Sequence, residues 1–89
     1  MCDINVRKSQ DDIHYFIEVT GVEGNVQFAV GEKRTKLSWY NAVRSGRQYY
    51  TLNYLPNGNR DADYTVHVYC DGEYVDEYDF YVSPRHSGY

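Results

Sequence analysis

The segment from Asn59 to Tyr74 constrains the fold of this chain more than any other segment. Apolar residues alternate with polar ones around Val66 and Val68, which is the period of a strand with one buried face. Asp71-Gly72 follows, and this pair tolerates the positive φ angles that a tight two-residue hairpin turn requires at both positions. The sequence therefore predicts a strand over 63–70 that pairs with the strand after the turn.

Short strands separated by turns are predicted along the rest of the chain as well. Tyrosine, valine and phenylalanine favour pleated sheets, and the chain has 11 tyrosines and an aromatic content of 17%. No helical period competes over any long window, and turn residues recur about every 8–12 residues, which is typical of a sandwich or barrel. The predicted strands are 3–7, 13–20, 25–30, 36–43, 48–55, 63–70 and 73–83.

The corner Asp61-Ala62-Asp63-Tyr64 narrows the fold class further. In immunoglobulin-like domains, a tyrosine near the start of strand F ties that strand to the preceding loop through its hydroxyl group. We therefore predict an all-β, immunoglobulin-like β-sandwich of about seven antiparallel strands, with Tyr64 as a structural residue. A chain of 89 residues suffices for one small domain, which we expect over 1–83, followed by a flexible tail over 84–89.

The predicted core consists of the residues on one side of each strand. Adjacent residues of a strand face opposite sides, so only one of Trp39 and Tyr40 can lie in the core. Trp39 is in register with Leu37 and Val43, which predicts Trp39 inside, as a structural residue, and Tyr40 at the surface. The full predicted core is Ile4, Val6, Ile17, Val19, Val26, Phe28, Val30, Leu37, Trp39, Leu52, Tyr64, Val66, Val68 and Phe80.

Charged residues are segregated along the chain. The stretch 33–60 contains six basic residues and no acid, whereas 61–79 contains seven acids and no Lys or Arg. Two interpretations stay open: a solvated surface on which neighbouring strands attract one another, and a docking face for a basic partner. The formal net charge of −4 argues against nucleic acid as the partner.

Catalytic and metal-binding motifs are not evident in the sequence. Cys2 and Cys70 lack a metal-ligand spacing, and we expect free, buried thiols unless the first strand lies beside the strand that carries Cys70. His67 should point outward beside Tyr69, as a surface group or a hydrogen-bonding partner of a tyrosine. We therefore expect no enzyme activity, no cofactor, no metal and no small-molecule substrate.

Three segments resemble the GBS Bsp-like repeat, an immunoglobulin-like accessory module of cell-wall-associated proteins in Gram-positive bacteria. They are Val26-Gln27-Phe28-Ala29-Val30, the run from Leu37 to Ala42 and the run from Ala62 to Tyr69. Trp39-Tyr40 match the second motif of the repeat, and Tyr64, His67 and Tyr69 match its third. The chain departs from the pattern at Gly31, Thr35-Lys36, Leu55-Pro56 and Ala62. The resemblance implies a module without catalytic activity, often present in tandem and beside wall-degrading domains.

Two hypotheses of function follow from different features. The resemblance implies a binding or adhesion module at the cell surface that contacts a protein or a cell-wall polymer. The residues after Met1 lack the apolar core of a signal peptide, which instead favours a free-standing phage-encoded protein in the cytoplasm or the virion. Such a protein would be a virion component or an inhibitor of a host defence protein. No segment has the apolar length of a membrane span.

The predicted contact face combines exposed tyrosines with the acids of the last hairpin. Period two sends several tyrosines away from the side of Val66 and Val68, and exposed aromatic area tends to mark interaction sites. Nearby carboxylates would steer a basic partner. Cross-strand tyrosine ladders that only stabilise the sheet are the alternative. The predicted partner-binding residues are Tyr40, Tyr69, Tyr81, Asp71, Glu73 and Glu77.

Overall fold

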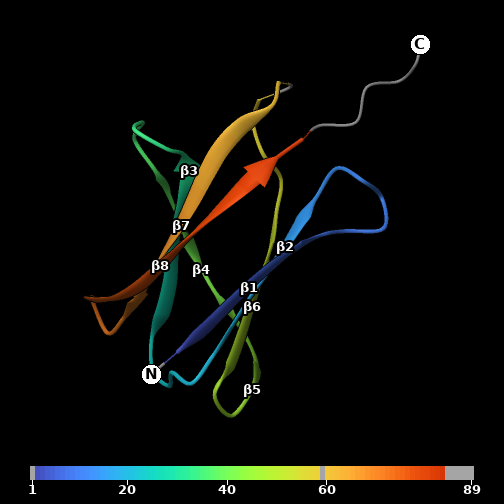
Figure 1. Ribbon diagram of the computed structural model, residues 1–89. Coiled ribbons are helices and arrows are strands. Elements are labelled where there is room, and N and C mark those ends of the chain that lie inside the picture. Colours follow the sequence, from blue (N-terminus) through green and yellow to red (C-terminus); the bar gives the residue numbers. More distant parts are fainter. Residues whose placement is uncertain (1, 59, 84–89) are drawn as a thin grey trace.

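The computed structural model describes residues 2–58 and 60–83, which form two antiparallel sheets packed face to face (Figure 1). Sheet I has the strand order β1-β2-β6-β5, with β1 Asp3–Lys8, β2 Tyr15–Thr20, β6 Tyr49–Tyr54 and β5 Val43–Gly46. Sheet II has the order β4-β3-β7-β8, with β4 Ser38–Asn41, β3 Val26–Glu32, β7 Ala62–Cys70 and β8 Glu73–Val82. The predicted all-β sandwich is thus confirmed. None of the described residues belongs to a helix long and apolar enough to cross a membrane.

The described residues form eight strands because the predicted strand 36–43 is divided between the two sheets. β4 pairs with β3 in sheet II, and β5 pairs with β6 in sheet I. The chain passes from one sheet to the other at Ala42, whose N–H donates to the carbonyl of Val26. When the strands are lettered A, B, C, C′, D, E, F and G, the sheets read A-B-E-D and C′-C-F-G. Immunoglobulin-like domains share this distribution, and that classification stays a prediction.

The core lies between the inner faces of the two sheets. Phe28 is fully buried, as are valine and isoleucine side chains from β2, β3 and β7. Predicted core residues that are buried are Ile17, Val19, Val26, Phe28, Val30, Tyr64, Val66 and Val68, and those packed at its margin are Ile4, Val6, Leu52 and Phe80. The core also contains Cys2, Tyr15, Tyr50, Tyr54 and Val82.

The prediction for Trp39 and Tyr40 is wrong. Tyr40 pairs with the buried Phe28, so its side chain faces inward, and its ring contacts that of Tyr54 from the opposite sheet. Trp39 and Leu37 therefore face outward, and 56% of Trp39 is exposed. The register of β4 against β3 decides this, because both sides of β4 carry aromatic or aliphatic residues and the alternation alone is ambiguous.

The hairpin turn after β7 lies where the sequence predicts it, and Tyr64 lies near the start of β7. Asp71 and Gly72 both have positive φ angles, 52° and 83°, as the turn requires. Tyr64 is buried, and its hydroxyl lies beside Gly58 in the loop before β7, since a methyl group on Gly58 would sit 3.5 Å from that oxygen. The hydrogen bond from Tyr64 to this loop stays a prediction.

Candidate binding face

The outer face of sheet II brings together side chains from four strands in two cross-strand rows. Trp39, Ala29, His67 and Glu77 form one row, in the order β4, β3, β7 and β8. Asn41, Gln27, Tyr69 and Tyr74 form the next row toward the β7–β8 turn. Val75 is an extra residue of β8, a bulge that sets Tyr74 opposite Tyr69 and Asp76 opposite Val68.

Small residues of β3 make room for the large side chains of β4. Ala29 is 3% exposed although it lies on the outer face, opposite Trp39. Leu37 covers Gly31 in the same way, because a Cβ atom at Gly31 would lie 3.1 Å from the Leu37 Cδ2 atom. The large side chains of the edge strand β4 therefore lie against small residues of β3, and the Trp39 ring reaches across β3.

Four rings form a continuous group that we call the aromatic face: Trp39, Tyr69, Tyr74 and His67. The Trp39 and Tyr69 ring centroids are 4.7 Å apart, those of Tyr69 and Tyr74 are 5.8 Å apart, and those of Tyr74 and His67 are 5.9 Å apart. These spacings are contact distances, so no ligand group fits between the rings. A ligand must lie on top of the rings, where Trp39 and Tyr74 are each more than half exposed.

Glu77 provides the carboxylate of this face. The Tyr74 hydroxyl donates to Glu77 Oε1 at 2.7 Å, and His67 Nε2 lies 3.7 Å from the same oxygen. The hydrogen bond to Glu77 raises the pKa of Tyr74 to about 12, because loss of the phenolic proton would put two negative charges side by side. Glu77 therefore fixes the orientation of the most exposed tyrosine of the aromatic face.

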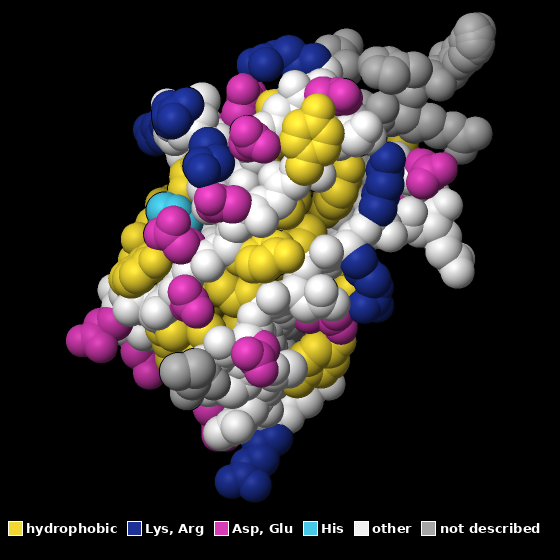
Figure 2. Space-filling model, viewed as in Figure 1, with side chains coloured by type: hydrophobic (Ala, Val, Ile, Leu, Met, Phe, Trp, Pro, Cys, Tyr) yellow, Lys and Arg dark blue, Asp and Glu magenta, His cyan; other side chains and the backbone are white. Residues whose placement is uncertain are grey.

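The two ends of sheet II differ in charge. Toward the β3–β4 loop, Lys33 Nζ lies 2.8 Å from Asp79 Oδ2, and this ion pair lowers the pKa of Asp79. The pair borders a hollow of about 190 Å³ that also touches His67 and Glu77. At the opposite end, no described Lys or Arg lies within 4.0 Å of the carboxylates of Asp71, Glu73 and Asp76, and the same is true of Glu77 between the two ends. Figure 2 shows acidic side chains, in magenta, at the lower left, where β7 turns into β8.

The predicted contact residues fall into three groups. Tyr69 and Glu77 belong to the outer face of sheet II, and Tyr81 lies farther along it, opposite Asp63, with 57% of its surface exposed. Tyr40 faces the core, so its predicted exposure is wrong. The acids Asp71 and Glu73 lie at the hairpin, where the Asp71 carboxylate accepts a hydrogen bond from the Asn25 N–H.

Three members of the aromatic face were not predicted from the sequence: Trp39, Tyr74 and, as a member of a ring cluster, His67. A signal for Trp39 was present, because Ala29 and Gly31 alternate with the bulky Phe28 and Val30 and leave space on one side of β3. Tyr74 gave no comparable signal, since the bulge at Val75 shifts the alternation of β8.

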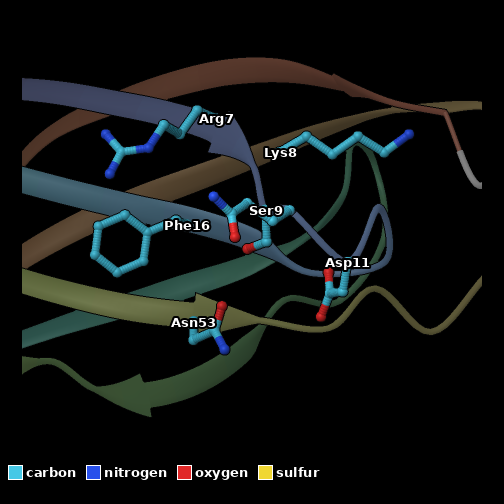
Figure 3. Close-up of a pocket in the computed structure, with 7 residues that line it drawn as sticks. Arg7, Lys8, Ser9, Asp11, Phe16 and Asn53 are labelled. Carbon is cyan, nitrogen blue, oxygen red and sulfur yellow. The ribbon is translucent and has the colours of Figure 1, made fainter.

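A second hollow, of about 540 Å³, lies on the outer face of sheet I beside β1 (Figure 3). The Arg7 guanidinium lies 4.9 Å from the centre of the Phe16 ring, and its Nη1 atom is 2.8 Å from Glu18 Oε1. The only arginine that lines this hollow is therefore already paired within the domain. Its other lining residues are Lys8, Ser9, Gln10, Asp11 and Asn53.

An apolar band crosses the centre of Figure 2, where the edges of the two sheets meet between β1 and β8. Val6, Tyr15 and Phe80 line this groove of about 470 Å³, and all three belong to the core or its margin. Tyr15 also accepts a hydrogen bond from the Ser83 N–H. The groove is thus the open edge of the sandwich.

The two cysteines are free thiols, as predicted. Cys2 is buried, whereas Cys70 is only half-buried, and burial raises the pKa of both thiols. The first strand does not lie beside the strand that carries Cys70, because β1 belongs to sheet I and β7 to sheet II. Among residues 2–58 and 60–83, no group of three or more His, Cys, Asp or Glu side chains could hold a metal ion.

Comparison with known proteins returned no match to a family model, to a curated protein or to a solved structure. The resemblance to the GBS Bsp-like repeat stays a prediction from its motifs.

Proposed function

We propose that this domain is a non-catalytic binding module that contacts a protein or cell-wall partner through the aromatic face. One observation carries the proposal: Trp39, Tyr69 and Tyr74 are in ring contact on an outer sheet face, with Trp39 and Tyr74 more than half exposed. Tryptophan and tyrosine are enriched among residues that dominate binding energy, and exposed aromatic area tends to mark interaction sites.

The order of the rings supports binding as well. Each ring contacts its neighbour, and Glu77 holds the Tyr74 hydroxyl, so the side chains lose little rotamer freedom when a partner covers them. Tyrosine and tryptophan also present a large area with few rotatable bonds. A binding surface of this kind is ordered before the partner arrives.

The polar groups of the face support a role without catalysis. His67 and Glu77 face each other and Tyr74, and neither approaches a serine, threonine or cysteine at hydrogen-bond distance among the described residues. A nucleophile next to a base is the arrangement that covalent catalysis requires. The resemblance to wall-associated repeats also implies a module without catalytic activity. A cell-wall polymer would suit the aromatic face, since aromatic side chains stack on sugar rings.

A capture experiment tests the proposal. The immobilised wild-type domain is compared with the double variant Trp39→Ala/Tyr74→Ala and with Phe16→Ala, an aromatic residue on the outer face of sheet I. Each immobilised domain is incubated separately with purified Gram-positive cell walls and with a cellular protein fraction. Circular dichroism verifies that each variant is folded. We expect the double variant to lose most of the capture and Phe16→Ala to retain it. Equal loss in both variants, or full capture by the double variant, would contradict the proposal.

A further inference from the structure

We infer that the partner is a protein that presents an arginine, whose guanidinium lies on the Tyr74 ring and pairs with Glu77. This inference rests on the proposed function and specifies its ligand. The Glu77 side chain is 49% exposed and lies beside the exposed ring of Tyr74. Both contacts of its carboxylate use Oε1, and no donor within the described residues engages Oε2.

The domain contains the same chemistry in completed form on its other sheet. Arg7 lies opposite Phe16 in the β1–β2 pairing, and its guanidinium lies over the Phe16 ring (Figure 3). The same guanidinium pairs with Glu18. On sheet II, a ring and a carboxylate again share one face, on Tyr74 and Glu77 of β8. β8 is an edge strand, so its neighbour on that side must come from outside sheet II.

Arginine fits this arrangement better than lysine does. The face of an aromatic ring attracts a cation, and the contacts among the rings leave only the top of the group accessible. A guanidinium is planar, stacks on a ring and can donate several hydrogen bonds in the plane of a carboxylate. An ammonium group is compact and strongly hydrated, so it presents no planar surface to a ring and forms no bidentate pair with a carboxylate.

Charge complementarity selects a basic protein as the occupant. The acids near the β7–β8 turn have no described Lys or Arg within 4.0 Å, and the whole chain has a formal net charge of −4. The negative electrostatic potential of these acids speeds the encounter with a basic partner. Salt weakens this attraction, because charges are screened beyond about 8 Å at physiological ionic strength. A neutral sugar polymer is not attracted by this negative potential.

Trp39 provides a fluorescence signal on the aromatic face, because it is the only tryptophan of the chain and contacts Tyr74 through Tyr69. The domain is titrated with a blocked peptide that carries three spaced arginines, while Trp39 fluorescence and the amide resonances of residues 74–77 are followed. The same peptide with citrulline has nearly the same shape without the charge, and the lysine peptide has the charge without the planar group. We expect the arginine peptide to perturb both signals and to bind about tenfold more tightly than either analogue.

Two matched variants separate a specific pair from general attraction. Glu77→Gln and Glu73→Gln each remove one negative charge near the hairpin, but only Glu77 lies on the aromatic face. We expect about a tenfold loss of affinity for Glu77→Gln and less than a twofold loss for Glu73→Gln. Equal losses would overturn the inference, as would equal binding of the lysine peptide or no response to the arginine peptide.

A sugar control separates this inference from the proposed function. N-acetylglucosamine oligomers are titrated in the same way. A response of Trp39 to the oligomers without a response to the arginine peptide would overturn the arginine inference and leave the binding module intact. A capture experiment in which the aromatic-face variant behaves as wild type would instead remove the proposed function itself.

Discussion

The Trp39 ring reaches across β3 and packs on the Tyr69 ring of β7, with centroids 4.7 Å apart and an angle of 53° between the ring planes. The two residues lie on strands that are not neighbours in the sheet, and Ala29 of β3 is buried beside them. The contact therefore couples the edge strand β4 to the centre of sheet II and supports the aromatic face from one side.

The neighbours Trp39 and Tyr40 should respond oppositely to truncation. Trp39→Ala removes a half-exposed ring and one aromatic pair, so we expect the free energy of unfolding to fall by about 0.5–1.5 kcal/mol. Tyr40→Ala leaves a gap against Phe28 and Tyr54, and we expect a loss of about 3 kcal/mol. Urea denaturation followed by circular dichroism measures both. A larger loss for Trp39→Ala would contradict the register of β4.

The hydroxyl of Tyr50 should stabilise the loop between β2 and β3. It donates to the carbonyl of Gly24 and accepts from the N–H of the same residue, each at 3.1 Å. Tyr50→Phe deprives both backbone groups of their partner, and we expect a loss of about 1–3 kcal/mol in urea denaturation. Tyr81→Phe, at an exposed tyrosine, is the control and should change stability by less than about 0.5 kcal/mol. Equal effects would show that the Gly24 bonds contribute nothing.

Tyr64→Phe tests the predicted corner. The Tyr64 ring is buried against Tyr54 and Phe80, and its hydroxyl lies beside Gly58. The variant keeps the ring contacts and removes only the hydroxyl, so we expect a loss of about 1–3 kcal/mol if that group is bonded to the loop. An unchanged denaturation midpoint would count against the corner and against the immunoglobulin-like classification.

Acid should destabilise the domain in part through Asp11. Its carboxylate accepts hydrogen bonds from the N–H groups of Ile13 and His14, which lower its pKa to about 2. Because the folded pKa lies below the unfolded value, this stabilisation is complete above about pH 4 and is lost as the pH falls toward 2. The free energy of unfolding, measured by denaturation at each pH between 4 and 2, should fall less steeply with decreasing pH for Asp11→Asn than for the wild type. Parallel curves would contradict this assignment.

Glu77→Gln should lower the pKa of Tyr74. The carboxylate accepts the Tyr74 hydroxyl proton and opposes formation of a second negative charge, and the neutral amide removes the charge. The chemical shift of a ¹³C-labelled tyrosine ring, followed from about pH 9 to about pH 12, measures the change. Glu73→Gln is the control and should leave Tyr74 unaffected. An unchanged pKa of Tyr74 in Glu77→Gln would contradict the hydrogen bond between the two residues and the place of the Glu77 carboxylate on the aromatic face.

Local patterns account for the parts of the fold that could be predicted. The turn at Asp71-Gly72 depends on the backbone freedom of two residues, and the strands depend on an alternation that each segment carries by itself. The inward position of Val66 and Val68 followed because the other side of β7 carries Thr65 and His67. Where one side of a strand is clearly polar, the alternation identifies the buried face.

The candidate site could be predicted only in part, because it depends on pairing between distant segments. Tyr69 follows the inward Val68, and Glu77 lies three residues before the inward Phe80, so the alternation within each strand placed both of them on the outer side. Tyr74 lies before the bulge at Val75, and a bulge moves every residue beyond it to the other side of the strand. The contact of Trp39 with Tyr69 required the order of the strands in sheet II.

The sequence by itself determined that this chain forms short antiparallel strands, a tight last hairpin and a valine-rich core, because these features follow from residue period and turn chemistry. Only the tertiary structure decided that Tyr40 faces the core and Trp39 the solvent. Both sides of β4 can be buried, and the pairing of Tyr40 with Phe28 selects one of them. The aromatic face exists because that choice placed the tryptophan outside, over the small residues of β3.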